Sequence, residues 1–541
     1  MNPMLRQYLK PSPSPAERAC GVLLHVTSLP GGFGCGDLGG ARRFLDYLHT
    51  AGVRWWMMLP VHPVDRSGCP YKTSSVFAAS PLMIDLDDLV EQGLLDRATV
   101  RRAATVRRAA TVRRAAARAR RAGAVKGWGA SAARGDSSDR SDYAAAAAMR
   151  MPLLREAFRE FRASGLCDRL DYVHFVTSQP WVDDFAAFAA LKRAHGGRVW
   201  TSWPRAARRM TPADRDRLTE SEEAFEFSRF CQFILDEQWG RLRDEASRRG
   251  VALLGDIPFF VAHDSADAWA SPELFELDRK GLPRTVSGVP ADLFNRRGQR
   301  WGHPQYRWRA HVETGFAWWV ARFRRALEMF DAVRLDHFIG LHRLWSIPAA
   351  DRDARRGRWI RTPGEGLLSA LRNRLGELPV VAEDLGVLTR RAAELRDAFG
   401  FPGMRVLQFG FGDESAGSRY HRPEGYPRKC VGFTGTHDND TLKGWLESLP
   451  EATFERVRHY AGVGRSGVHE ALIRRLLESE ADLVMLPMQD VLRLGGEARM
   501  NRPGVARGNW RWRLSARQLS ESSARRLRER IEESGRLVHN S

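Results

Sequence analysis

DAVRLDHF, residues 331–338, joins a short apolar run to a cluster of ionisable side chains. The apolar residues are typical of a buried strand, and the cluster stands at its carboxyl end. Burying Arg, Asp and His unpaired costs on the order of a few kcal/mol. Arg334 and Asp336 are two residues apart, so on a strand they point to the same side. There the guanidinium would keep Asp336 ionised, which suits a covalent nucleophile; a structural ion pair is the alternative.

Seven further short apolar runs predict strands, and helical segments separate most of them. With the first run they make eight, the number in a (β/α)₈ (TIM) barrel of the α/β class, whose catalytic groups lie past the carboxyl ends of the strands. Acidic residues recur at that position: Asp256, Asp336, Glu383, Asp438 and Asp490. The predicted strands are Gly21–His25, Trp55–Pro60, Val251–Pro258, Ala332–Phe338, Val380–Gly386, Gly403–Phe409, Cys430–Asp438 and Asp482–Asp490.

The 541 residues are expected to form a single catalytic barrel, 1–541, with one long insertion. Residues 61–245 lack strong strand signals and contain helical stretches, which predicts a mainly helical insertion between the second and third strands. Inside it, a six-residue repeat and the Gly/Ser-rich tract that follows predict a basic, flexible segment at 97–142.

The net charge of +20 first suggests a nucleic-acid or other anionic partner. Ten Arg and one Lys fall between residues 97 and 126 without an acidic residue, so more than half of the excess lies in one segment. No aromatic residues interleave with these arginines, as a single-strand-binding surface would require. A tandem duplication in a surface loop is therefore favoured over a polyanion-binding arm, and nucleic acid is not an expected partner.

The six cysteines are far apart and form no CxxC or Cys/His pattern, so the sequence predicts neither a zinc site nor a disulfide framework. The polar, Pro-rich start lacks the apolar core of a secretion signal. No apolar run is long enough to span a membrane. These features predict a cytoplasmic enzyme without a membrane partner.

Several acids around one cleft, without a phosphate loop or a metal-ligand cluster, suit acid/base chemistry at an acetal. One carboxylate would attack the anomeric carbon, and a second, kept protonated, would give its proton to the leaving oxygen. Arg334 marks Asp336 as the ionised group, and the apolar setting of Glu383 favours a raised pKa. His437, next to Asp438, could donate to a sugar hydroxyl. At this point a barrel lyase or aldolase stays open, although no Lys stands at a strand end.

Four segments in order, GDIPFFVAHDSADAWASPELF (255–275), VRLDHF (333–338), AEDLG (382–386) and GTHDND (435–440), resemble the 4-α-glucanotransferases of the amylomaltase family, in the α-amylase-type clan. The resemblance extends to SGCPYKTSSVFAASPLMIDL (67–86), SGVPADLFNRRGQRWGHPQYRW (287–308) and LPMQDVLRLGGEARMNRPGVARGNWRWR (486–513). It covers nearly the whole chain except about 97–140.

The resemblance implies that Asp336 is the nucleophile, Glu383 the general acid/base and Asp438 the transition-state stabiliser. Arg334 and His437 would be neighbouring donors, and Asp256 would support the donor sugar. Further substrate-binding residues implied by the matching loops are Tyr71, Ser74, Pro290, Asp292, Phe294, Trp301 and Asn501. No metal or other cofactor is implied.

The implied reaction moves a segment of an α-1,4-glucan to the 4-hydroxyl of another glucan or of glucose, through a covalent glycosyl-enzyme. Expected substrates are maltooligosaccharides and dextrins from starch or glycogen. One alternative is a hydrolase of the same clan, in which water resolves the intermediate. Another is a nucleic-acid-binding protein with an inactive barrel, which would have no need of all three carboxylates.

Overall fold

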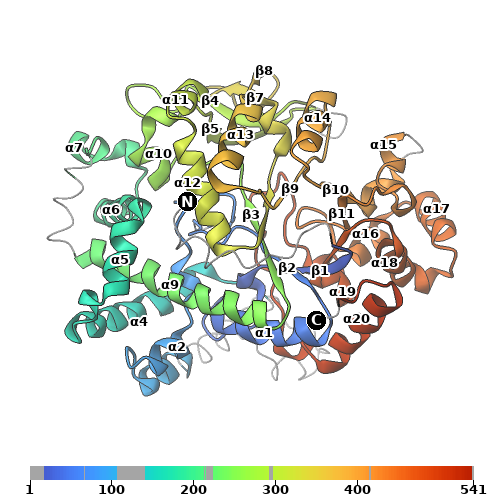
Figure 1. The fold of residues 1–541 in the computed structure, drawn as a ribbon, viewed down its shortest axis with the longest axis horizontal. Helices are drawn as coiled ribbons and strands as arrows, with labels where there is room; N and C mark the ends of the chain where they lie inside the picture. Colours follow the sequence, from blue (N-terminus) through green and yellow to red (C-terminus); the bar gives the residue numbers. More distant parts are fainter. Residues whose placement is uncertain are drawn as a thin grey trace, which may run out of the picture.

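The computed structural model describes residues 17–65, 67–105, 140–211, 214, 223–291, 296–412 and 416–538. Eight parallel strands close into a barrel in the order β1-β12-β11-β10-β9-β6-β3-β2 (Figure 1). The strands are β1 (Ala19–Leu23), β2 (Trp55–Met57), β3 (Ala252–Ile257), β6 (Ala332–Leu335), β9 (Val380–Ala382), β10 (Gly403–Val406), β11 (Cys430–Phe433) and β12 (Leu483–Pro487). Each of the eight predicted strands is present, which confirms the barrel.

Every residue of these eight strands is buried, as expected for a parallel barrel covered by helices. The strands end earlier than their apolar runs predicted. For example, β6 ends at Leu335, and His337 then takes a left-handed conformation with φ of 51°. The chain therefore leaves the ladder at Asp336, because the residues that follow form the loops of the site.

Helices surround the barrel and fill the insertion between β2 and β3, which confirms that this insertion is mainly helical. The insertion contains α2 (Leu86–Glu91), α4 (Tyr143–Ala163), α5 (Leu170–Ser178), α6 (Pro180–Ala194), α7 (Arg205–Arg208) and α9 (Glu223–Arg248). The other helices are α1 (Leu38–Thr50), α10 (Ala266–Ala270), α11 (Trp308–Glu313), α12 (Ala317–Met329), α13 (Gly364–Leu375), α14 (Arg390–Ala398), α15 (Ala416–Arg419), α16 (Leu442–Ser448), α17 (Glu451–Ala461), α18 (Val468–Glu478), α19 (Met488–Val491) and α20 (Glu521–Glu533).

An aromatic cluster holds the insertion together. Phe161 of α4 packs against Tyr172 of α5 and Phe230 of α9, with ring centroids 5.3 and 5.1 Å apart. All three rings are buried, so the packing of large apolar surfaces stabilises these helices against one another. Their amphipathic pattern follows from this shared core.

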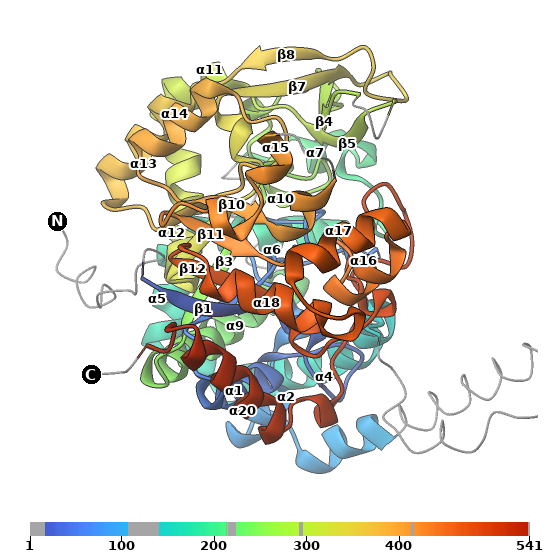
Figure 2. The same cartoon turned by 90° about the vertical axis from the view of Figure 1, so that its right-hand side faces the viewer.

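A second sheet, with strand order β5-β4-β7-β8, lies beyond the barrel and was not predicted (Figure 2). It consists of β4 (Thr285–Val289), β5 (Gln299–Pro304), β7 (Arg343–Pro348) and β8 (Arg358–Arg361), all antiparallel. The strands come from the two connections that flank β6. β5 is mostly half-buried and rich in polar residues, and β8 is largely exposed with an Arg at each end, so the periodicity of hydrophobic residues gave no strand signal.

Most of the arginine-rich repeat lies outside the described residues. Its described beginning, 97–105, is helical, and Val100 in it is buried. After the gap, Ser141 donates a hydrogen bond to the Thr27 carbonyl (2.8 Å), and the Asp142 side chain caps α4. Both described ends of the segment expected to be flexible are thus joined to the fold. In the part of the chain that the structure describes, no helix has the length and apolarity needed to cross a membrane.

Candidate active site

Arg334 links two of the predicted carboxylates. In the barrel ladder, Arg334 of β6 stands opposite Asp256 of β3. Its Nη1 atom lies 2.8 Å from both carboxylate oxygens of Asp256, and its Nη2 atom lies 3.0 Å from Oδ1 of Asp336. Burial disfavours the charged guanidinium, but the charges of Asp256 and Asp336 outweigh burial and raise the pKa of Arg334. Arg334 therefore stays a cation that fixes both carboxylates.

The turn after β6 directs Asp336 into the opening of the barrel. The Asp336 side chain is 30% exposed, whereas Arg334 beneath it is buried. The Asp336 amide donates to the Ile257 carbonyl (3.0 Å), which fixes the start of the turn to the end of β3. A carboxylate with a fixed cation on one side and an open face on the other is arranged to attack an incoming group.

Glu383 follows β9 and is bound to the same turn. Its Oε2 accepts a hydrogen bond from the His337 amide (2.8 Å), and its Oε1 accepts one from the Leu385 amide (3.0 Å). Burial raises the pKa of Glu383 to about 7; Asp336 adds to the rise, and Arg334 and the two amides oppose it. A carboxyl group that exchanges its proton near neutral pH is suited to serve in turn as acid and base.

Asp438 lies in the loop after β11 and is held by the loop that follows β12. The Asn501 Nδ2 atom donates to Asp438 Oδ1 (2.6 Å), and Arg499 donates to the Asp438 carbonyl (2.7 Å). The backbone N–H of Asn501 also donates to the His437 carbonyl (3.1 Å). The Asp438 side chain is 50% exposed, so it is available to substrate. Its position is set by residues of the loop after β12.

Tyr71 and His437 join the two sides of the cleft. The Tyr71 hydroxyl donates to Asp256 Oδ2 (2.6 Å) and lies 3.0 Å from Nε2 of His437. Burial and the charge of Asp256 raise the pKa of Tyr71 well above its usual value, so the hydroxyl stays a neutral donor. His437 Nε2 is in turn 3.6 Å from Asp438. One chain of contacts thus runs from Asp336 through Arg334, Asp256, Tyr71 and His437 to Asp438.

Trp301, in β5, forms part of the wall next to Asp336. Its ring meets the His337 ring edge to face with centroids 5.0 Å apart. Burial lowers the pKa of His337 to about 4, so the imidazole is neutral near pH 7 and can exchange hydrogen bonds with a neutral hydroxyl. The second sheet, which the sequence did not predict, therefore reaches the site through Trp301.

The structure defines less about the remaining predicted substrate-binding residues. The Ser74 backbone N–H donates a hydrogen bond to the Pro63 carbonyl (3.1 Å), and the Ser74 carbonyl accepts one from the Ala266 N–H (2.8 Å). The loop that contains Tyr71 is therefore tied to the connection after β3. Pro290 follows β4 and is partly buried. Asp292 and Phe294 lie outside the described residues, and their predicted contacts with substrate stay predictions.

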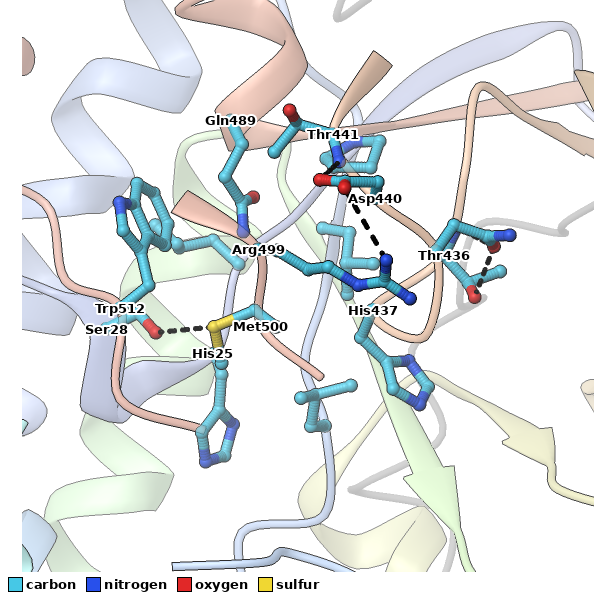
Figure 3. A pocket seen from close by; sticks show the side chains of 15 residues that line it. His25, Ser28, Thr436, His437, Asp440, Thr441, Gln489, Arg499, Met500 and Trp512 are labelled. Carbon is cyan, nitrogen blue, oxygen red and sulfur yellow. Dashed lines mark hydrogen bonds and ion pairs between the residues drawn. The ribbon is translucent and has the colours of Figure 1, made fainter. Parts of the chain in front are cut away.

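A small cavity beneath His437 shows residues that the sequence analysis did not single out. His25, Ser28, Arg499 and Met500 line it together with His437 (Figure 3). The space is about 20 Å³, enough for one water molecule. Both His25 Nδ1 and His437 Nδ1 are buried without a hydrogen-bond partner in the described structure, and burial lowers the pKa of His25 to about 3. The His25 imidazole is therefore neutral near pH 7 where it lines the cavity beside His437.

Two residues near these loops are structural. Asp490 accepts hydrogen bonds from the Thr434 hydroxyl (2.6 Å) and the Leu442 amide (2.7 Å), so it anchors the two ends of the loop that contains Asp438. Within the described residues, the Asn509 side chain forms hydrogen bonds only with backbone atoms of Arg502 and Val505. Neither belongs to the chain of contacts around Asp336. Among the described residues, no group of three or more His, Cys, Asp or Glu could hold a metal ion.

These features define the class of protein. Carboxylates at the carboxyl ends of β6 and β9, with a third in the loop after β11, are typical of a barrel enzyme that works at glycosidic bonds through nucleophilic and acid/base catalysis. The groups are positioned by a fixed cation and by backbone amides. The site belongs to a barrel enzyme of carbohydrate chemistry.

Comparisons with known proteins agree with this class. The pattern of the 4-alpha-glucanotransferase family matches residues 24–519. A 4-alpha-glucanotransferase of Thermus thermophilus is 41% identical over 532 residues, covering 96% of this chain and 99% of the relative. One from Synechocystis sp. is 38% identical over 523 residues, covering 93% and 95%. The solved amylomaltase of Streptococcus agalactiae in complex with acarbose superposes with a TM-score of 0.85 at 31% identity, covering 96% of this chain and all of that structure.

The chain belongs to the 4-alpha-glucanotransferase family. The function implied by the four sequence motifs is thereby confirmed: the protein is a transferase of glucan segments, and the hydrolase alternative is not favoured.

Proposed function

We propose that this enzyme transfers α-1,4-glucan segments by a retaining double displacement in which Asp336 forms the covalent intermediate. The observation that supports it best is the placement of Asp336 and Glu383 around one turn. Arg334 contacts Asp336, and Glu383 accepts a hydrogen bond from the next residue, His337. The Arg334 cation holds Asp336 in place, and burial favours the proton on Glu383.

In the first half-reaction, Asp336 attacks the anomeric carbon of the donor glucan as the bond to the leaving oxygen breaks. Glu383, protonated below its pKa of about 7, gives its proton to that oxygen, and the shortened glucan leaves. Asp438, which is half exposed, would accept hydrogen bonds from sugar hydroxyls and stabilise positive charge on the ring. His437 would contact the same sugar, and the fully buried Asp256 would support it through Arg334 and Tyr71.

In the second half-reaction, Glu383 is a carboxylate and removes the proton from the 4-hydroxyl of an acceptor. That oxygen attacks the anomeric carbon and releases Asp336, so two inversions retain the α configuration. Bound acceptor sugar excludes water and is held in position, which favours transfer over hydrolysis. Trp301 supplies one wall on this side.

The proposed substrates are maltooligosaccharides and dextrins from starch or glycogen, with glucose as the smallest acceptor. The site places several carboxylates and neutral imidazoles in one cleft, which suits the many hydroxyls of a neutral sugar. All of the chemistry is assigned to side chains of the protein, so dialysis against a chelator is expected to leave the activity unchanged.

The test is to incubate the purified enzyme with maltotriose and to follow glucose and longer maltodextrins together. Transfer gives glucose and a ladder of longer chains. Asp336→Asn is expected to lose about 10⁴-fold or more of the rate, as removal of a catalytic nucleophile does elsewhere. Asp353→Asn is a matched control, because this carboxylate pairs with Arg355 at the surface and should leave the rate unchanged.

Other outcomes would replace the proposal. Glucose and maltose without a ladder would mean that water resolves the intermediate. A fully active Asp336→Asn variant would remove Asp336 from the mechanism. Absence of turnover on every α-1,4-glucan, together with salt-dependent binding of DNA or RNA that needs residues 106–126, would favour the nucleic-acid alternative.

A cytoplasmic location is also proposed. The described part of the chain contains all six cysteines and no disulfide, and four of the cysteines are buried. Cysteines without disulfides are typical of a protein from a reducing compartment. Fractionation of the native cells tests this, and recovery of the enzyme with extracellular or periplasmic markers would contradict it.

A further inference from the structure

A second concave site lies between the four-stranded sheet and the start of α14. It has a volume of about 470 Å³ and is lined by Arg343, Arg361, Arg390 and Arg391 together with His342 and Trp359. We call it the arginine pocket. In Figures 1 and 2, β7, β8 and α14 lie in the same upper part of the molecule, outside the barrel. The pocket is separate from the cavity beneath His437.

The positive charge of this pocket is largely uncompensated. No carboxylate is among the described residues that line it. Arg390 pairs with Glu394 at 2.7 Å, but within the described chain neither Arg361 nor Arg391 forms an ion pair. Burial and the nearby charges of Arg343, Arg391 and Arg361 lower the pKa of His342. Such a concentration of like charge is unfavourable without an anion between the arginines.

One of the arginines is set in place by aromatic packing. The Arg343 guanidinium lies 4.0 Å from the centroid of the Trp359 ring, which in turn meets Trp345 edge to face at 5.1 Å. The Nε atom of Arg343 is buried and has no hydrogen-bond partner in the described structure. The stacking on Trp359 therefore fixes this guanidinium at the wall of the pocket.

The chemistry of the lining distinguishes between possible ligands. Arginine offers five donors and no acceptor, whereas a neutral sugar presents hydroxyls that need acceptors as well. A phosphate group offers acceptors only and matches the guanidinium fork. Arg390 and Arg391 are the first two residues of α14, so the positive end of the helix dipole adds to the same preference. Trp359 is 40% exposed and gives a sugar ring a surface beside the arginines.

The arginine pocket is also connected to the catalytic loops. His342 comes directly after the short helix that follows Asp336, and Thr389 ends the loop that follows Glu383. The Thr389 hydroxyl and Nδ1 of His342 are 3.0 Å apart. The two loops that contain the proposed nucleophile and acid/base thus meet at the wall of the pocket.

We propose that the arginine pocket binds a phosphate monoester carried by a carbohydrate. The phosphate would lie between Arg361, Arg391 and the exposed donors of Arg343, with the sugar beside Trp359. Two sources share this chemistry: a phosphorylated glucan and a free sugar phosphate. The inference concerns a site that the transfer reaction itself does not use.

Calorimetric titration tests the binding, with glucose 6-phosphate and inorganic phosphate as probes at low ionic strength. Arg361→Ala/Arg391→Ala removes two exposed donors and should weaken the binding of both probes at least about 10-fold, as expected for lost charge-assisted bonds. Arg517→Ala/Arg526→Ala is the control, because these two arginines are also exposed and the net charge falls equally. Equal affinity in wild type and the first variant, or binding of neither probe, would overturn the proposal.

The source of the phosphate is decided by transfer assays with phosphorylated and neutral maltodextrins. If the glucan carries it, Arg361→Ala/Arg391→Ala should raise KM for the phosphorylated dextrin about 5-fold or more and leave the neutral one unchanged. If KM for both stays constant while glucose 6-phosphate binding is lost, the ligand is the free sugar phosphate. Transfer on neutral maltotriose tests the proposed function separately, so failure of one proposal leaves the other intact.

Discussion

Among the described residues, one side-chain hydrogen bond from another loop holds the Asp438 carboxylate. Asn501 donates to its Oδ1 at 2.6 Å, and a hydrogen bond to a charged group contributes about 1.5–3 kcal/mol. Asn501→Ala is therefore expected to lower kcat for maltotriose about 10- to 100-fold with a smaller change in KM. Asn509→Ala is the matched control, since its bonds reach only backbone atoms of its own loop. Equal effects of the two variants would show that Asn501 only shapes the loop.

The pH dependence of the donor step follows from Glu383. Its pKa is raised to about 7, first by burial and then by Asp336, so the acid form is present below that pH and is lost above it. With maltotriose, kcat/KM should fall as the pH rises through about 7. A donor with fluoride as the leaving group needs no proton, so this decrease should be absent with α-glucosyl fluoride. A decrease of the same size with both donors would assign the titration to another group.

The candidate catalytic residues could be predicted from sequence because they stand next to apolar runs whose ends define a barrel. The contacts between these residues could not be predicted. Tyr71 lies 185 residues from Asp256 and 366 from His437, and no local pattern relates positions so distant. The same holds for Asn501 and Asp438. Such pairs are set by how the barrel closes, which periodicity does not describe.

At the scale of elements, the hairpin of β4 and β5 forms a wall of the cleft. Trp301 packs on His337, so Trp301→Ala would open a path for water next to Asp336. We expect the ratio of hydrolysis to transfer on maltotriose to rise about 10-fold, because the acceptor loses its advantage of position. The increase in reducing ends reports hydrolysis and the length of the product ladder reports transfer, so the two together measure this ratio.

Trp301→Phe keeps an aromatic ring, so its ratio of hydrolysis to transfer should lie between those of the wild type and Trp301→Ala. Trp359→Ala is a control on the same sheet, outside the set of contacts around Asp336, and should leave the ratio unchanged. If Trp301→Ala lowered transfer and hydrolysis equally, the ring would serve substrate binding alone and not the exclusion of water.

The barrel strands were predicted and the second sheet was not, for a common physical reason. A parallel strand buried on both faces is a run of apolar residues, such as β11 (CVGF). By contrast, β8 (RWIR) is short, largely exposed and begins and ends with Arg, and pairing with the antiparallel strand β7 holds it at the edge of the sheet. Its stability comes from pairing, which a single sequence window cannot indicate.

At the scale of the whole molecule, the barrel closes where its first and last strands meet. Ala19 of β1 stands opposite Leu483 of β12. Arg536, which follows α20 and is fully buried, donates to the carbonyls of Ala19 (3.2 Å), Ser479 (2.7 Å) and Asp482 (3.2 Å). The end of the described chain therefore secures the seam between β1 and β12, far along the sequence from the first strand.

Arg536→Met should keep the volume of the side chain and remove its hydrogen bonds to these carbonyls, although the Asp482 carbonyl still accepts from the Ala19 N–H and the Ser479 carbonyl from Arg18. The expected loss is about 3 kcal/mol in the free energy of unfolding, because each of the three lost hydrogen bonds contributes about 1 kcal/mol. The melting temperature should fall, while kcat of the folded enzyme at 25 °C stays within about 2-fold, since none of these groups contacts the catalytic carboxylates. Arg528→Met, an exposed position on α20, should change neither. A lower kcat of Arg536→Met at an unchanged melting temperature would contradict this account. It would mean that Arg536 affects the active site without stabilising the closure of the barrel.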